Sequence, residues 1–235
     1  MPEGVLGGSF TSAISVSEPR TLTSDHVPSP PAPRPGKVVC VGRNYLEHAR
    51  ELGNEVPSEP LIFLKPSSSI ISEGDYIERP PQSSQVEFEG EIGVLIGRRL
   101  RRAEESDAVA AIAGIVAVND VTARDLQRKD SQWSRAKGFD TFCPVGNVHP
   151  APVDLTTLEV VTRVNGKERQ RARSSDMAFQ IPMLLSYISH IMTLEPGDLV
   201  ATGTPAGVGP LVSGDVVEVE IPGVSRVSNP VRDVG

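Results

Sequence analysis

The chain consists largely of short apolar runs separated by turns rich in glycine and proline. Four of these runs are too short for typical helices and rich in valine, isoleucine and leucine, so they predict strands. They lie at residues 38–41, 61–64, 199–201 and 216–221. Two further strand-like segments, within residues 158–173, flank the dipeptide Asn165-Gly166. Because Asn-Gly favours the tight turn of a β-hairpin, a hairpin is predicted there.

Apolar residues at helical spacing predict only a few helices. One is expected over residues 106–113, with acidic residues in its first turn and the next strand starting near Ile115. A second is expected over residues 177–192, where Pro182 either kinks the helix or delays its start. A third begins at Asn44, a residue type that caps helices. Since the strands outnumber the helices and do not alternate with them, the pattern predicts a strand-dominated α+β fold.

The first 36 residues differ in composition from the rest of the chain. They are rich in serine and threonine, and residues 28–36 form a proline-rich stretch typical of an extended linker. We therefore expect residues 1–36 to be a small N-terminal extension with a linker, and residues 37–235 to be the main domain. A domain of that length can bury a sizeable core.

Composition and charge argue against several classes of function. The formal net charge of −7 disfavours nucleic acid as a main partner. No apolar stretch approaches the roughly 20 residues of a membrane span, and the N-terminus lacks a signal-peptide pattern. A cytoplasmic protein without a membrane partner is therefore expected. In that compartment Cys40 and Cys143 are predicted to be reduced thiols in the core.

Two glutamates interrupt an apolar, strand-like run over residues 88–96. Side chains two apart on a strand point to the same face, which places Glu89 and Glu91 roughly 7 Å apart. Two buried carboxylates repel each other and are costly to desolvate. A divalent cation would remove both penalties, and oxygen ligands suit Mg²⁺, Mn²⁺ or Ca²⁺. The alternative is an edge strand with two solvated glutamates.

A second apolar run, over residues 111–119, stops at Asp120. An acidic residue at the end of a buried strand is well placed to face a shared pocket. Three carboxylates leave room for about three waters or substrate oxygens in the octahedral shell that Mg²⁺ prefers. The alternative for Asp120 is a turn or cap residue before a helix that starts near Thr122.

Other residues could contribute chemistry. His48 and Glu51 lie three apart on the short helix, where they could act as a general base, or be an ordinary solvated pair. Lys65 and Lys137 interrupt apolar surroundings and could bind a substrate anion, although a lone lysine of this kind is usually exposed. The glycine-rich stretch 202–209 could bind a carboxylate through backbone N–H groups, or be a plain turn.

Several motifs in order carry a family resemblance. They are Gly42-Arg43-Asn44-Tyr45 with His48, Phe63-Leu64-Lys65-Pro66, Glu89-Gly90-Glu91, Asn119-Asp120-Val121-Thr122-Ala123-Arg124-Asp125, Ala136-Lys137-Gly138-Phe139-Asp140 and Thr202-Gly203-Thr204-Pro205. From about Lys37 to its end the chain resembles the fumarylacetoacetate hydrolase family. Within that family it is similar to short bacterial 2-hydroxyhepta-2,4-diene-1,7-dioate isomerases, acylpyruvases and fumarylpyruvate hydrolases.

The resemblance implies a mixed β-sandwich or roll with a few short helices, usually in a homodimer. It implies one Mg²⁺ or Mn²⁺ per subunit, which Ca²⁺ could replace, bound by Glu89, Glu91 and Asp120. The catalytic residues it implies are His48, Glu51 and Lys137. The residues it places along the substrate are Arg43, Tyr45, Lys65, Gln127 and Thr204. One departure lies before the glutamate pair, where some relatives have histidines and this chain has Glu87 and Phe88.

Family substrates are small 2-oxo or 2-hydroxy-2-enoic acids, often dicarboxylates. The presence of both His48 and Glu51 favours C–C bond hydrolysis of an acylpyruvate-type substrate. Isomerisation or tautomerisation of 2-hydroxyhepta-2,4-diene-1,7-dioate and decarboxylation of oxaloacetate are the alternatives at the same site. A non-catalytic metal- or ligand-binding protein is a further, less favoured alternative, because the residues implied for catalysis are all present.

Overall fold

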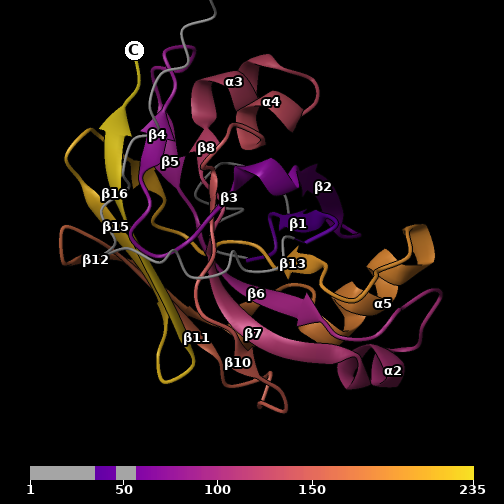
Figure 1. Cartoon of the computed structure of the whole chain (residues 1–235). Coiled ribbons are helices and arrows are strands. Elements are labelled where there is room, and N and C mark those ends of the chain that lie inside the picture. The colour runs from indigo at the N-terminus through magenta and orange to yellow at the C-terminus, as the bar shows by residue number, and fades with distance from the viewer. Residues whose placement is uncertain (1–34, 46–56) are drawn as a thin grey trace, which may run out of the picture. The chain divides into compact units, whose positions relative to one another are not determined.

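Strands carry most of the regular structure in this protein (Figure 1). The computed structural model describes residues 35–45 and 57–235, all within the unit Pro33–Gly235. In these residues the strands form sheets of six, five, three and two strands, accompanied by four short α-helices. The predicted strand-dominated α+β fold is therefore confirmed. The predicted extension 1–36 lies almost entirely outside the described residues, as does most of the helix expected from Asn44.

The six-stranded sheet holds the apolar runs identified in the sequence. β1 and β13 run parallel, and the other neighbouring pairs are antiparallel. In order across the sheet the strands are β10 (His149–Pro150), β7 (Ile112–Asn119), β6 (Gly90–Ile96), β13 (Leu199–Ala201), β1 (Val38–Gly42) and β2 (Leu61–Lys65). Because β6 and β7 are interior strands, residues on both of their faces are buried.

The five-stranded sheet supplies the opposite wall of the core. In order it contains β12 (Lys167–Arg173), β11 (Glu159–Val164), β15 (Val216–Ile221), β16 (Ser225–Asp233) and β4 (Ile77–Arg79). The largest apolar cluster joins Ile92 and Ile115 of the first sheet to Val160 and Val219 of the second. Apolar residues of α5 (Ile181–Ile191) complete this cluster. Sheet-on-sheet packing of this kind fits the β-sandwich that the family resemblance implies.

Smaller elements connect the two main sheets. The three-stranded sheet contains β14 (Gly209–Pro210), β5 (Val86–Phe88) and β8 (Thr122–Ala123). The two-stranded sheet contains β3 (Ile70–Ile71) and β9 (Cys143–Pro144). The short helices are α2 (Glu105–Ala110), α3 (Arg124–Lys129) and α4 (Ser134–Lys137), and two 3₁₀ turns lie at Ser67–Ser69 and Ser174–Asp176.

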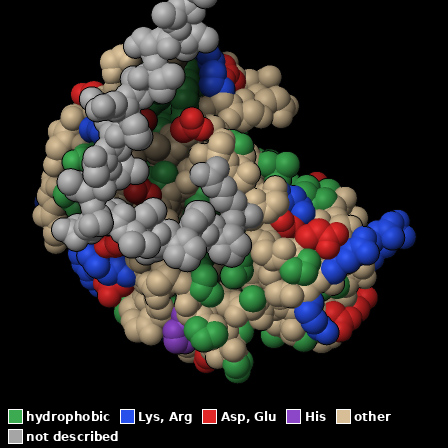
Figure 2. Space-filling view, viewed as in Figure 1, with side chains coloured by type: hydrophobic (Ala, Val, Ile, Leu, Met, Phe, Trp, Pro, Cys, Tyr) green, Lys and Arg blue, Asp and Glu red, His purple; other side chains and the backbone are tan. Residues whose placement is uncertain are grey.

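The outer surface of the five-stranded sheet is strongly charged. Arg163 donates to Glu218 (2.9 Å) and Glu220 (2.7 Å) across neighbouring strands. On the face drawn in Figure 2, basic and acidic side chains lie close together in several places. Partly exposed surface pairs of this kind contribute little to stability, about 0–1 kcal/mol each. Charges buried inside the protein therefore require a separate explanation.

Several predicted elements are confirmed and two boundaries are wrong. The hairpin turn has the expected positive φ angles, 52° at Asn165 and 74° at Gly166. Pro182 lies in the first turn of α5, so it delays the helix start instead of kinking the helix. The helix expected over residues 106–113 ends at Ala110, and the next strand starts at Ile112 instead of near Ile115.

The apolar run 88–96 is two strands and not one. β5 ends at Phe88 in the three-stranded sheet, and β6 begins at Gly90 in the six-stranded sheet. Glu89 therefore lies at the point where the chain passes from one sheet to the other. Glu89 and Glu91 are therefore not on one continuous strand, although a carboxylate oxygen of each lies within 4.8 Å of the other.

Two further expectations concern the thiols and membrane spans. Cys40 and Cys143 are both buried and free, as predicted. In the part of the chain that the structure describes, no helix is long and apolar enough to cross a membrane.

Candidate active site

Pairing between β6 and β7 brings three carboxylates to one place. Gly90 lies opposite Asn119 in the antiparallel ladder. The ladder is extended by one residue, because the Asp120 N–H donates to the Glu89 carbonyl (2.8 Å). The Asn119 amide oxygen also accepts from the Glu89 N–H (3.0 Å). Glu89 and Asp120 therefore lie side by side at the same end of the strand pair as Glu91.

The three side chains form a buried acidic cluster. Glu89, Glu91 and Asp120 each offer one carboxylate oxygen, and these oxygens all lie within 4.8 Å of one another. Their exposed fractions are 5%, 1% and 0%. The alternative of an edge strand with solvated glutamates is therefore wrong. Asp120 is not a helix cap either, because α3 has Ala123 at its N-cap position.

Two buried lysines neutralise part of this cluster. Lys137 donates to Glu89 Oε2 (2.8 Å) and Asp120 Oδ2 (2.6 Å), while Lys65 donates to Asp120 Oδ1 (2.6 Å) and to the Val121 carbonyl (3.1 Å). The usual expectation that such lysines are exposed is wrong, since both are buried. Burial alone would lower the pKa of Lys137, but the charges of Asp120 and Glu89 outweigh it and raise that pKa. Lys137 therefore keeps its proton.

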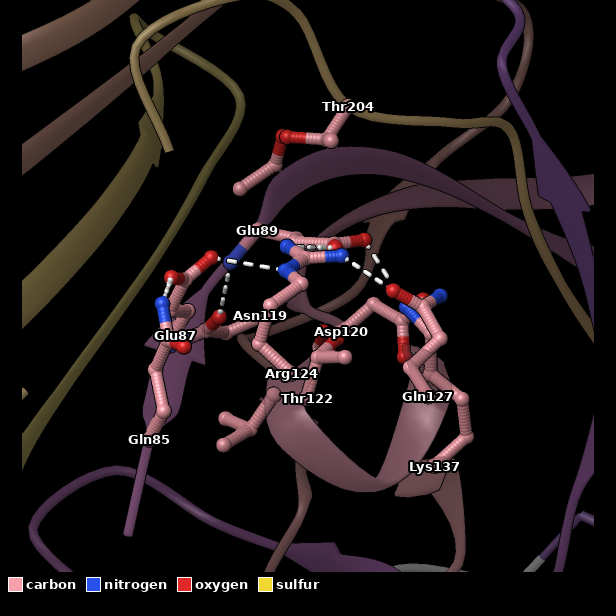
Figure 3. Close-up of polar contacts among 12 residues, drawn as sticks. Gln85, Glu87, Glu89, Asn119, Asp120, Thr122, Arg124, Gln127, Lys137 and Thr204 are labelled. Atoms are coloured by element: carbon pink, nitrogen blue, oxygen red, sulfur yellow. Dashed lines mark hydrogen bonds and ion pairs between the residues drawn. The ribbon is translucent and has the colours of Figure 1, made fainter. Parts of the chain in front are cut away.

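Arg124, to which the sequence analysis gave no role, is the third buried cation. Its guanidinium donates to Glu87 Oε2 (2.7 Å), Glu89 Oε1 (2.5 Å) and Gln127 Oε1 (2.5 Å), and Gln85 donates to Glu87 Oε1 (2.5 Å) (Figure 3). Glu87 thus shares Arg124 with Glu89. Arg124 stands in the first turn of α3, inside a motif that the sequence displays, but its carboxylate partners are 35 and 37 residues away.

Glu91 is the carboxylate of the cluster without a cationic partner among the described residues. Its Oε2 accepts from the Gly203 N–H (2.8 Å), so the glycine-rich loop binds a carboxylate of the protein itself. Gly203 has a φ of +102°, and a Cβ there would lie 2.7 Å from Asn44 Cβ. Burial, followed by the charges of Asp120 and Glu89, raises the pKa of Glu91 well above its usual value.

The cluster fits a hard divalent cation. Its donors are three carboxylates, the ligand type that Mg²⁺ and Mn²⁺ prefer. Two of them, Glu89 and Asp120, are already held in place by buried cations. The third, Glu91, has a raised pKa, and a bound cation would stabilise its charged form. Glu89, Glu91 and Asp120 could therefore hold such an ion, and their role as ligands remains a prediction.

A cavity of about 370 Å³ opens above the cluster. Six of the residues implied for the site line it. They are Arg43, Glu89, Glu91, Gln127, Lys137 and Thr204. Lys65 and Asp120 are not among the lining residues, although they contact each other in the buried layer. Tyr45 is 2% exposed and packs in the main core, so its predicted contact with substrate remains untested.

Aromatic and basic residues form the remaining wall of the cavity. Phe63 and Trp133 meet edge to face with their ring centroids 5.3 Å apart. Lys137 Nζ lies 5.0 Å from the Phe63 centroid, close enough for a cation–π contact. Gly42 lies against Trp133, where a Cβ would approach the ring to 3.1 Å. The next residue, Arg43, has a φ of 58°, an uncommon conformation for a non-glycine residue.

His48 and Glu51 lie outside the described residues, and so does most of the segment 44–60 that contains them. Their role as a general-base pair therefore remains a prediction. None of the described residues that line the cavity is a histidine.

Asp125 fixes the start of α3, which carries Arg124 and Gln127. Its carboxylate accepts from the Ser83 hydroxyl (2.6 Å) and the Ser84 N–H (2.9 Å). Slight burial would raise the pKa of Asp125, but these hydrogen bonds outweigh it and lower that pKa to about 2. Because this pKa is lower in the folded than in the unfolded protein, the ionised Asp125 stabilises the fold at pH values above the unfolded-state pKa. That stabilisation is lost as the pH falls towards about 2.

Asp125→Asn is therefore expected to destabilise the protein at pH 6 by about 1 kcal/mol, a value reduced for solvent screening. The difference from the wild type should shrink steadily between pH 4 and pH 2. Thermal unfolding of both proteins over this range measures it. An equal difference at every pH would show that Asp125 acts through packing and not through its charge.

Comparisons with known proteins identify the family of this chain. The family model described as "Fumarylacetoacetate (FAA) hydrolase C-terminal" matches residues 37–232. The chain is 46% identical over 197 residues to the mitochondrial oxaloacetate tautomerase of Arabidopsis thaliana, covering 81% of this chain and 88% of that protein. It is 44% identical over 195 residues to the mitochondrial oxaloacetate decarboxylase of Dictyostelium discoideum, covering 80% and 89%.

A solved structure shows the same fold. The crystal structure of 2-hydroxyhepta-2,4-diene-1,7-dioate isomerase from Mycobacterium marinum is 46% identical to this chain. It matches with a TM-score of 0.79 and covers 86% of this chain and 76% of that one. These similarities span the sheets that hold the acidic cluster.

Proposed function

The chain belongs to the fumarylacetoacetate (FAA) hydrolase family, and on that basis we propose that it is a divalent-metal-dependent enzyme acting on small 2-oxo or 2-hydroxy-2-enoic acids. The observation that carries this proposal is the buried cluster of Glu89, Glu91 and Asp120 at the base of a basic cavity. These residues would hold Mg²⁺ or Mn²⁺. A bound cation of this kind would supply Lewis-acid polarisation of a substrate carboxylate and its neighbouring keto oxygen.

The basic residues around the cavity support a dicarboxylic substrate. Arg43 and Arg128 line the cavity, and neither has a carboxylate partner among the described residues. A guanidinium is the preferred partner of a carboxylate in proteins because the two groups match in shape. We propose that one or both arginines bind the carboxylate farther from the keto group.

Lys137 supports chemistry that builds negative charge on a substrate oxygen. It lines the cavity, contacts Glu89 and Asp120, and keeps its proton. A fixed ammonium group in a buried site stabilises such charge as it develops. Keto–enol tautomerisation, decarboxylation and double-bond isomerisation of 2-oxo acids all pass through an enolate. The related proteins named above are called a tautomerase, a decarboxylase and an isomerase.

We therefore propose enolate chemistry on an oxaloacetate-like acid as the main activity. Hydrolysis of a C–C bond in an acylpyruvate, the activity favoured by the sequence, becomes the second proposal, because it also needs a base that activates water. His48, assisted by Glu51, is the residue predicted to supply that base. The proposed substrate is a small molecule, with no nucleic acid or membrane partner. The homodimer also remains a proposal.

Replacing His48 by alanine separates these two activities. Hydrolysis of acetylpyruvate should fall at least about 100-fold, since a positioned general base contributes about 10²–10⁴-fold. Mn²⁺ affinity should stay within about twofold of the wild type, because His48 is not one of the predicted ligands. Product formation and a Mn²⁺ titration measure the two effects. Undiminished hydrolysis would show that His48 does not activate the water.

A proton NMR time course in D₂O tests the proposed function. Oxaloacetate and acetylpyruvate are incubated separately with the protein and Mg²⁺, with EDTA and protein-free controls because free Mg²⁺ also acts on oxaloacetate. Metal- and protein-dependent C3 deuteration, ketonisation or pyruvate formation from oxaloacetate is the expected result. Release of acetate from acetylpyruvate would establish the hydrolase activity. No acceleration of either substrate would contradict the proposal.

A further inference from the structure

Gln170 is a buried amide in an otherwise polar, exposed strand. It is 2% exposed, and it is the one residue of β12 that is fully buried. Most of the other residues of β12 are charged and face solvent. A buried side-chain amide is costly unless its hydrogen-bonding groups find partners. The partners of Gln170 therefore indicate why it is there.

All the strong partners of Gln170 belong to the candidate site. Its Oε1 accepts from the Gly90 N–H (3.0 Å), between the two predicted ligands of the Glu-x-Glu motif. Its Nε2 donates to Thr204 Oγ1 (2.8 Å) and to the Pro205 carbonyl (2.8 Å). A backbone N–H can only donate and a carbonyl can only accept, so these partners fix which end of the amide is which.

This orientation also fixes the Thr204 hydroxyl. Because Gln170 Nε2 donates to Thr204 Oγ1, the hydroxyl must direct its own proton elsewhere. The Gly90 carbonyl receives it, at 2.9 Å. Gln170, Thr204 and both polar groups of the Gly90 peptide thus form a closed set of hydrogen bonds. The set joins the five-stranded sheet, the metal-ligand segment and the loop that lines the cavity.

Close packing keeps this arrangement tight. Gln170 lies opposite Thr162 in the β11–β12 hairpin. A Cβ on Gly90 would lie 1.9 Å from Thr162 Oγ1 and 3.3 Å from Gln170 Oε1. The hairpin therefore presses directly on the backbone between Glu89 and Glu91. Only a glycine leaves room for the amide of Gln170 to reach that peptide.

We propose that Gln170 is a positioning residue of the active site, acting through Thr204 and the Gly90 peptide. It sets the relative placement of the segment that carries Glu89 and Glu91 and of the loop that faces the substrate. This inference rests on the proposed function for its purpose, although the hydrogen bonds exist without it. Gln170 does not line the cavity and is not proposed to touch substrate.

Gln170→Met tests the proposal, because methionine has a similar shape but lacks the amide. Thr162→Val is a matched control. Thr162 is buried in the same hairpin beside Gly90, and its hydroxyl has no hydrogen-bond partner among the residues that the structure describes. Thr204→Val removes the hydroxyl that Gln170 holds, and Thr204→Ser restores it. Each variant is titrated with Mn²⁺, and then with oxalate at saturating Mn²⁺, at a temperature where all are folded.

Gln170→Met is expected to weaken Mn²⁺ or oxalate binding about five- to tenfold, the effect of losing a buried hydrogen bond that orients the site. Thr204→Val should act similarly, and the double variant should be no weaker than the worse single variant. Thr162→Val should bind like the wild type, and Thr204→Ser should recover most of the affinity that Thr204→Val loses. A merely structural Gln170 would lower the melting temperature and leave both affinities unchanged, and that result overturns the proposal.

Failure of the proposed function gives a different result. If the wild type binds Mn²⁺ and oxalate but turns over no 2-oxo acid, the affinities still decide the role of Gln170. If the wild type binds no Mn²⁺, the proposed function fails. In that case the melting temperatures of the single and double variants decide whether Gln170 and Thr204 act as a unit. Additive losses would then overturn the inference.

Discussion

Replacing Asp120 by asparagine is expected to lower the free energy of unfolding by about 3–5 kcal/mol, the usual cost of leaving a buried charge without its partner. Asp120 accepts from Lys65 through one oxygen and from Lys137 through the other. Asparagine offers a single neutral oxygen to these two buried ammonium groups. Lys137 keeps Glu89, but Lys65 keeps no carboxylate partner among the described residues.

The same substitution should abolish divalent-cation binding and all metal-dependent turnover. Urea denaturation measures the stability, and a Mn²⁺ titration measures the binding. Asp140→Asn is the control, because Asp140 is an exposed aspartate in the neighbouring loop. Asp140→Asn should leave both quantities near those of the wild type. An Asp120→Asn protein as stable as this control would contradict the ion pairs described above.

Replacing Glu91 by glutamine is expected to have the opposite effect on the metal-free protein. Glu91 is buried beside two carboxylates and has no cationic partner among the described residues. Burial and the neighbouring charges raise its pKa. A raised carboxyl pKa favours folding at low pH, and that contribution is lost as the pH rises through the folded-state pKa. Glutamine removes the charge, so the metal-free variant should be at least as stable as the wild type at neutral pH.

The Mn²⁺ affinity of Glu91→Gln should nevertheless fall by at least about 100-fold. Loss of a hydrogen-bond partner of a metal ligand alone costs about 10- to 100-fold, and this substitution alters a predicted ligand itself. In the wild type Mn²⁺ must displace any proton on Glu91, so its affinity should rise with pH, and this rise should weaken in the variant. Melting temperatures in EDTA compare the stabilities of the two metal-free proteins, and melting temperatures with Mn²⁺ over a range of pH compare their metal affinities. A metal-free variant clearly less stable than the wild type would show that Glu91 carries a stabilising charge.

The contrast between Asp120 and Glu91 was not visible in the sequence. Both follow or interrupt apolar runs, a pattern that left a shared buried pocket and a solvated or turn position open as alternatives, and the family resemblance favoured the shared pocket. Local patterns report burial and the direction of a side chain along its own strand. They do not report which cation arrives from elsewhere in the chain. Lys65 is 55 residues from Asp120, and only the folded structure shows that the two meet.

Some parts of the fold could not be predicted from the sequence for the same reason, because their partners lie far away along the chain. β16 has a buried face that includes Ser225 and Asn229, so it lacks a clear apolar alternation. Asn229 is satisfied by carbonyl groups more than 150 residues away. The break between β5 and β6 at Glu89 was hidden because buried residues continue on both sides of it. Gln170 likewise carries no local signal, since it stands in a charged strand.

The family resemblance supplied what the pattern could not, namely the substrate class and the residues facing it. Arg43, Gln127 and Thr204 do line the cavity. Lys65 lies in the layer beneath it and bonds to Asp120, which suits a role in orienting that carboxylate. Arg124 was inside a quoted motif and yet received no role, because its two carboxylate partners become neighbours only through the β5–β8 pairing.

The central claim is that Glu89, Glu91 and Asp120 bind a divalent cation that engages a 2-oxo acid. Anomalous diffraction from crystals grown with Mn²⁺ and oxalate tests it most directly. The account predicts one anomalous peak in contact with all three carboxylates, with oxalate oxygens completing its coordination and Lys137 beside the ligand. A peak elsewhere in the protein, or none at this cluster while the lysines retain all of their carboxylate contacts, would contradict it.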